Sequence, residues 1–92
     1  MSATLLLKER TDLGVAFVEL VIWQLPRRLP GSDHRYKYRL ALVHQGVDVI
    51  RYDNESGKGD HRHIGRREEQ YHFVDLDTLI RDFREAVRKY LQ

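Results

Sequence analysis

The stretch VAFVELVIWQL (residues 15–25) decides the fold, because it is the longest apolar-rich segment of the chain. In an extended chain its apolar side chains divide between two faces, with Val15, Phe17, Val21 and Trp23 on one and Ala16, Val18, Leu20 and Ile22 on the other. Apolar residues on both faces predict a central strand that is covered on both sides. The segment contains Glu19 and Gln24 and is shorter than the roughly 20 apolar residues that span a membrane.

The segments on either side of this stretch predict further strands. Residues 35–43 alternate, with Tyr36, Tyr38, Leu40 and Leu42 on one face and Arg35, Lys37 and Arg39 on the other. Gln45 and Gly46 predict a turn into a strand over residues 47–52. Residues 4–9 predict a first strand, followed by a turn at residues 12–14. Successive hairpins are typical of an antiparallel meander.

The C-terminal segment predicts an amphipathic helix. Its apolar residues recur every three or four positions: Leu76, Leu79, Ile80, Phe83, Val87, Tyr90 and Leu91. Asp75 is a suitable N-cap, and Arg88 and Lys89 lie near the C-terminus, where cations are favoured. The predicted fold class is therefore α+β: one domain over residues 1–92, with an antiparallel meander of about four or five strands and a C-terminal helix packed on one face.

The amino-acid composition indicates the cellular compartment and the kind of ligand that the protein binds. The 92 residues contain no cysteine, which excludes disulfides and thiolate metal sites and fits a reducing cytoplasm. The start, MSATLLLKER, has no basic region before its leucines, so we expect no signal peptide. Lys and Arg number 16 against 14 Asp and Glu, but the positive charge is concentrated in residues 27–39 and 57–67. These two basic patches predict a local anion-binding face.

The stretch YDNESGKGDHRHIGRR (residues 52–67) carries the candidate chemistry. If residues 58–65 are extended, His61 and His63 share one face, while Lys58, Asp60 and Arg62 share the other. Two imidazoles can supply a general acid and a general base at neutral pH. We therefore predict a metal-independent endoribonuclease, without a cofactor. In it His61 and His63 are the acid–base pair, Lys58 and Arg62 stabilise the phosphate, and Tyr52 and Asp53 orient a base or a histidine.

Two other interpretations of the same stretch stay open. The residues also fit a solvated, glycine-rich hairpin with hydrogen-bonded surface histidines. Alternatively, His-x-His with a nearby aspartate matches ligands that zinc or manganese accept. The further ligands would then come from residues that no spacing specifies: Asp53, Asp60, His34, His44 or His72. We expect the last three to be surface residues rather than ligands, and Glu68 and Glu69 to form a salt-bridged turn without a function.

The basic strand predicts a binding surface for RNA. Its two tyrosines are expected in the core, and its cations on the opposite face. We expect the RNA backbone to contact Arg35, Lys37, Arg39, Arg66 and Arg67. A solvated face without a ligand would show the same pattern. The basic face also leaves open a protein without catalysis, which would block a ribosomal or other target by binding.

Three segments together resemble the TumE family of bacterial toxin–antitoxin proteins. They are VIWQLPRRLPGSDHRYKYRL (residues 21–40), RYDNESGKGDHRHIG (residues 51–65) and REEQYHFVDLDTLIRDF (residues 67–83), and the similarity runs over nearly the whole chain. The resemblance implies a toxin of a type II system that is encoded beside its antitoxin. That antitoxin is typically a helix-turn-helix DNA-binding protein that neutralises the toxin by direct contact. The resemblance assigns no catalytic residue.

Overall fold

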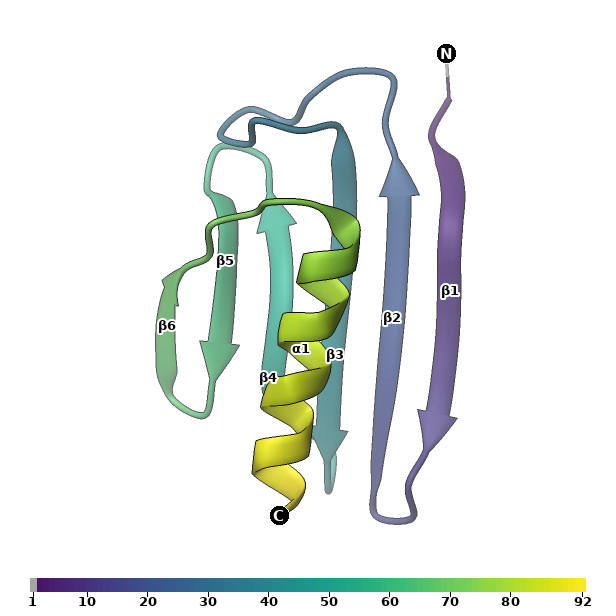
Figure 1. Cartoon of the computed structure of the whole chain (residues 1–92), viewed down its shortest axis with the longest axis vertical. Helices are drawn as coiled ribbons and strands as arrows, with labels where there is room; N and C mark the ends of the chain where they lie inside the picture. Colours follow the sequence, from purple (N-terminus) through teal and green to yellow (C-terminus); the bar gives the residue numbers. More distant parts are fainter. Residues whose placement is uncertain (1) are drawn as a thin grey trace.

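The computed structural model describes residues 2–92 as a six-stranded antiparallel sheet with one helix (Figure 1). The strands follow one another across the sheet in chain order, so the predicted meander is confirmed. The elements are β1 (Thr4–Asp12), β2 (Ala16–Gln24), β3 (Tyr36–His44), β4 (Val47–Glu55), β5 (Gly59–Ile64), β6 (Arg67–Gln70) and α1 (Leu76–Leu91).

The sheet has more strands than the four or five that the sequence predicts, because the histidine stretch and the residues after it form β5 and β6. β4 continues to Glu55, turns over residues 56–58 and pairs with β5. β6 has the sequence REEQ, in which no apolar alternation can reveal a strand. It is placed by its pairing with β5, from Ile64↔Arg67 to His61↔Gln70.

Helix α1 lies over β3 and β4 on one face of the sheet, as predicted (Figure 1). Its side chains Leu79 and Phe83 are fully buried, and Phe83 meets the ring of Tyr52 edge-on, with the ring centroids 5.8 Å apart. Around them the core contains the buried side chains of Ala16, Leu20, Ile22, Tyr38, Leu40, Leu42, Ile50 and Tyr71. Burial of this apolar surface is the main stabilising contribution to the fold.

The opposite face of the sheet, here called the open face, is covered by no helix within residues 2–92. The prediction that β2 is covered on both sides is therefore wrong for this face, where Trp23 is 37% exposed. On this face, charged side chains rather than a second layer of helices lie against the apolar side chains. The guanidinium of Arg10 on β1, for example, lies 3.8 Å from the ring centroid of Phe17 on β2. Because the open face is polar and uncovered, it is available to a ligand.

The N-cap of α1 gives the first testable prediction. Asp75 accepts a hydrogen bond of 2.7 Å from the backbone N–H of Thr78, and this bond lowers the pKa of the Asp75 carboxyl. A carboxyl whose pKa is lower in the folded state stabilises the fold above its unfolded pKa and loses this contribution as pH falls through the folded pKa. We expect Asp75→Ala to melt at a lower temperature than wild type at pH 7 and the two proteins to converge in acid.

Circular dichroism melting curves between pH 7 and pH 2 measure this difference. Asp75→Asn is the matched control, because asparagine keeps an N-cap acceptor without a titrating charge. It should recover most of the stability at pH 7. A gap between Asp75→Ala and wild type that is equally large in acid would contradict the role of the charged cap.

Candidate active site on the open face

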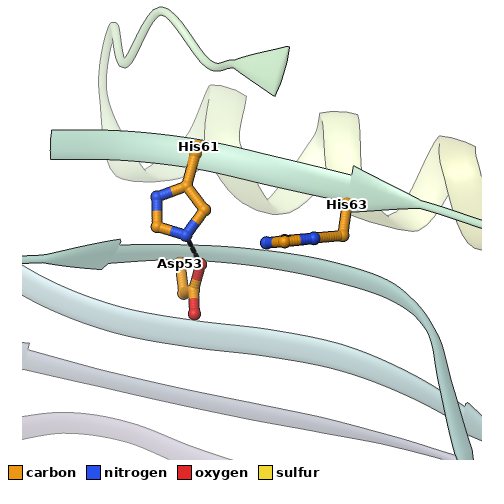
Figure 2. Close-up of side chains that lie close together, drawn as sticks. All are labelled: Asp53, His61 and His63. Carbon is orange, nitrogen blue, oxygen red and sulfur yellow. Dashed lines mark ion pairs between the residues drawn. The ribbon is translucent and has the colours of Figure 1, made fainter. Parts of the chain in front are cut away.

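Residues from β4, β5 and β6 meet on the open face near the β4–β5 turn. Tyr52 packs against Phe83, so the residue that follows it, Asp53, projects from the other face of β4. The strand register places Asp53 opposite His61. Figure 2 shows His61 and His63 projecting from β5 towards Asp53. We call Arg51, Asp53, Lys58, His61, His63 and Glu68 the open-face cluster.

His61 is buried within the cluster beside Asp53. Its side chain is 4% exposed, and its Nε2 lies 2.7 Å from Oδ1 of Asp53 (Figure 2). On the other side of the ring, Nδ1 lies 3.1 Å from the backbone carbonyl of Gly59, which can only accept a hydrogen bond. Both ring nitrogens therefore face oxygen atoms. The ring can donate to both only when it carries two protons.

The hydrogen bonding of the cluster is incomplete. Across residues 2–92, three buried side-chain atoms have no hydrogen-bond partner: Nε of Arg51, Oδ1 of Asp53 and Nε2 of His61. They lie at ion-pair distances, 3.2 Å from Arg51 Nε to Asp53 Oδ2 and 2.7 Å for the His61–Asp53 contact, but the directions are poor for hydrogen bonds. Native proteins rarely leave such groups unpaired, so their concentration here makes the cluster a candidate for a binding or catalytic site.

His63 is the more accessible histidine, with 24% of its side chain exposed. Its Nε2 lies 2.9 Å from a guanidinium nitrogen of Arg51, which can only donate, and 3.1 Å from Oε2 of Glu68, which as a carboxylate can only accept. These neighbours favour opposite protonation states of the ring. The His63 and His61 rings lie edge to face with their centroids 5.4 Å apart.

Glu68 links His63 to Lys58, because its other oxygen, Oε1, lies 2.8 Å from the Lys58 ammonium. The hydrogen bond between them raises the pKa of Lys58 and lowers the pKa of Glu68. Lys58 is therefore held charged at the end of the cluster. Together with Arg51, it provides positive charge on either side of His63.

Two residues expected at the site point away from it. Arg62 and Tyr52 lie on the helix-covered face, where an Arg62 guanidinium nitrogen donates to the Tyr52 hydroxyl over 3.2 Å and Nε lies 2.6 Å from Glu69. The alternation of β5 separates Arg62 from both histidines. The structure therefore offers Arg51, rather than Arg62, as the guanidinium beside the histidines.

The predicted RNA-binding cations divide between two places. Lys37 and Arg39 lie on the open face of β3, and Arg39 is the cross-strand partner of Asp53. Lys37 donates to the carbonyl of Asn54, and Arg39 lies 2.9 Å from Asp48 and 3.8 Å from Glu19. Arg35 is exposed just before β3, and Arg66 and Arg67 are exposed at the β5–β6 turn.

Two members of the cluster escaped the sequence analysis. Arg51 precedes Asp53 by two positions, and the alternation of a strand puts it on the same face, so this signal was present in the sequence. Glu68 was expected in a salt-bridged turn without a function. The structure instead places it on β6 beside His63 and Lys58, and its neighbour Glu69 binds Arg62 on the other face.

A second polar cluster lies on the helix-covered face, around Asp60. This carboxylate accepts three hydrogen bonds of 2.7 Å, from the Ser32 hydroxyl, His34 Nε2 and the Tyr38 hydroxyl. Burial, reinforced by Asp60, raises the pKa of Tyr38 far above its ordinary value. His34 was expected on the surface but is 10% exposed, with its ring centroid 3.9 Å from that of Phe73. The Asp60 cluster fixes the loop between β2 and β3.

The remaining candidate metal ligands lie apart from the open face. Asp60 and His34 belong to the second cluster, His44 contacts the hydroxyl of Tyr90 at 2.8 Å, and His72 is exposed after β6. Within the described residues, one group of three side chains has the ligand atoms of a metal site close together: Asp53, His61 and His63, all within 4.8 Å of one another.

Comparison with known proteins gives one family. The model of the family described as Toxin TumE matches residues 4–91, which is nearly the whole chain. No curated protein and no solved structure matches the chain. Within residues 2–92, no helix is both long and apolar enough to cross a membrane.

Proposed function

This chain belongs to the TumE toxin family, and from that premise we propose that it is the toxin of a bacterial type II toxin–antitoxin pair and cleaves RNA without a metal ion. A toxin of such a pair has an antitoxin partner, and we propose a helix-turn-helix DNA-binding protein in that role. The observation that carries the catalytic proposal is the open-face cluster. It combines two histidines of different exposure with the cations Arg51 and Lys58.

In the proposed reaction His63 is the general base. Its Nε2 accepts from Arg51 in the deprotonated form, and its side chain is the more exposed of the two histidines. It removes the proton from a ribose 2′-OH, and the 2′-oxygen attacks the adjacent phosphorus. The bond from phosphorus to the 5′-oxygen breaks, which leaves a 2′,3′-cyclic phosphate on one product. DNA lacks the 2′-OH and is not a substrate.

His61 is the proposed general acid: its Nε2 lies 2.7 Å from the carboxylate of Asp53, and a proton on this nitrogen is the one donated in the reaction. That proton passes to the departing 5′-oxygen, and the second product ends in a 5′-OH. The side chain is 4% exposed in the free chain, so this role requires the side chains that cover it to move when RNA binds. The charge that builds up on the phosphate is stabilised by Arg51 and Lys58.

The open-face cations carry a prediction about RNA affinity. Lys37 and Arg39 lie beside the cluster, and we propose that Arg35 and Arg66 extend the binding surface along the backbone of the RNA. Arg67 lies with Ile64 and Lys89 on the helix-covered face and is not part of this surface. In a His63→Ala background that does not cleave, Lys37→Glu/Arg39→Glu should weaken RNA binding. It should also lower the slope of log affinity against log salt concentration by about 0.7 for each phosphate that the variant no longer neutralises.

Fluorescence anisotropy with a labelled single-stranded RNA measures both quantities. Arg81→Glu/Arg84→Glu is the matched control, because it makes the same charge change on the exposed side of α1. If both double variants weaken binding equally, the effect is one of net charge and the open face is not the RNA surface.

A toxin that binds its target without cleaving it is the second candidate function, favoured by the basic side chains and the exposed Trp23 on the open face. Growth arrest on expression in bacteria separates the two. The cleavage proposal expects His61→Ala/His63→Ala to abolish growth arrest while the variant still binds the antitoxin encoded beside it. Retained arrest in this variant, together with loss of arrest in Lys37→Glu/Arg39→Glu, would reject cleavage in favour of binding.

A further inference from the structure

We propose that Asp53, His61 and His63 form a binding site for a transition-metal ion such as Zn²⁺, and that a bound ion blocks RNA cleavage. The binding site stands on the geometry of the three side chains alone. The block on cleavage rests on the proposed function, since the ion would occupy the nitrogen atoms that move the protons.

The three side chains offer the right atoms at short range. Their ligand atoms all lie within 4.8 Å of one another, and Asp53 and His61 are buried. Ligand atoms are roughly 3.4 Å apart when each is about 2.1 Å from a tetrahedral ion, so small side-chain movements would bring them into place. Two imidazoles and one carboxylate favour zinc, cobalt or nickel over magnesium or calcium, which prefer oxygen ligands.

The backbone of β5 prepares His61 as a ligand. The carbonyl of Gly59 receives the Nδ1 proton of the ring, as the second hydrogen bond of a metal-binding histidine commonly does. When the ring carries only this one proton, Nε2 has the free lone pair and can bind an ion. Nε2 is also the atom directed towards Asp53 (Figure 2).

The unpartnered atoms provide an independent indication. Nε2 of His61 and Oδ1 of Asp53 are 2.7 Å apart, yet neither has a hydrogen-bond partner because their directions are wrong for one. Two ligand atoms that lie close together without a hydrogen bond between them can instead share one bound ion. Such an ion would satisfy both atoms.

Arg51 must move for the ion to enter, since its guanidinium lies 2.9 Å from Nε2 of His63 and 3.2 Å from Oδ2 of Asp53. The same guanidinium already lies 3.4 Å from Asp48. Turning towards Asp48 would release His63 and keep the arginine paired. The metal ion and Arg51 therefore compete for one place, which explains how the cluster can work without metal and be inhibited by it.

The experiment titrates untagged, metal-free protein with Co²⁺ and records the visible absorption of the ion, then repeats the titration with Zn²⁺ by calorimetry. We expect one site per chain. Loss of an outer-shell partner of a ligand costs about 10–100-fold in affinity, so His63→Ala should cost at least as much. His44→Ala, which removes a histidine far from the cluster, is the matched control and should bind as wild type does. Equal binding by wild type and His63→Ala, or none by either, overturns the site.

A cleavage assay with and without one equivalent of Zn²⁺ tests the second half of the proposal. We expect Zn²⁺ to inhibit wild type and EDTA to restore cleavage. Stimulation by Zn²⁺ would overturn the inhibitory role. The metal site and the proposed function can be tested separately, because the Co²⁺ titration needs no RNA. If wild type binds Co²⁺, His63→Ala does not, and wild type cleaves no RNA, the metal site is supported and the proposed function is rejected.

Discussion

His63→Ala is expected to lower the rate of RNA cleavage by about 10²–10⁴-fold, the usual contribution of one general acid or base. This ring is the proposed base, and it is the more exposed of the two histidines in the open-face cluster. Single-turnover cleavage of an end-labelled RNA at saturating protein isolates the chemical step from RNA binding. His72→Ala, which removes an exposed histidine after β6, should cleave at the wild-type rate.

The fold should tolerate the change at His63, because the side chain lies at the surface and not in the core. Circular dichroism and the melting temperature check this. A His63→Ala protein that is folded and cleaves RNA within a factor of two of wild type would remove His63 from the mechanism. The identity of the base would then have to be sought elsewhere on the open face.

Asp60→Ala is expected to lower the free energy of unfolding by about 3 kcal/mol or more, because each buried donor that loses its acceptor costs about 1–3 kcal/mol. Three donors lose their acceptor at once: the Ser32 hydroxyl, His34 Nε2 and the Tyr38 hydroxyl. The loop between β2 and β3 also loses its side-chain connection to β5. Urea unfolding, followed by circular dichroism, measures the effect.

Two variants sharpen this prediction. Asp33→Ala removes an exposed carboxylate from the same loop and should change the free energy of unfolding by less than about 0.5 kcal/mol. Asp60→Asn keeps one oxygen acceptor and should fall between Asp60→Ala and wild type. If Asp60→Ala unfolds at the same urea concentration as Asp33→Ala, the Asp60 cluster does not hold the loop.

The parts of the fold that the sequence predicts are those with apolar periodicity. The helix is recognisable because Leu79 and Phe83 repeat at helical spacing and Asp75 caps its first turn. β3 is recognisable because its tyrosines and leucines alternate with cations. β6 has no apolar residue, so only its pairing with β5 defines it, and pairing is not encoded in periodicity. The uncovered face of β2 was missed because a strand that is apolar on both faces does not reveal how many helices cover it.

For the candidate site, the sequence predicts the face on which a side chain lies within one strand, but not the contacts between strands. Alternation alone places His61 and His63 on one face and Arg62 on the other. The register of the β4–β5 hairpin, which brings Asp53 opposite His61, depends on the turn over residues 56–58 and becomes visible only in the structure. Glu68 reaches His63 through β6, and no local pattern indicates that strand. Side chains that meet across strands are therefore the part of the site that required the fold.

The most direct test of the central claim is the product of cleavage in the absence of metal. Purified wild-type protein is incubated in EDTA with a structured RNA and with DNA of the same sequence, beside the His61→Ala/His63→Ala variant. We predict that wild type cuts only the RNA and leaves a 2′,3′-cyclic phosphate and a 5′-OH, and that the variant leaves both nucleic acids intact. Cleavage that EDTA abolishes, or equal cleavage by the variant, would contradict a metal-independent reaction carried out by these two histidines.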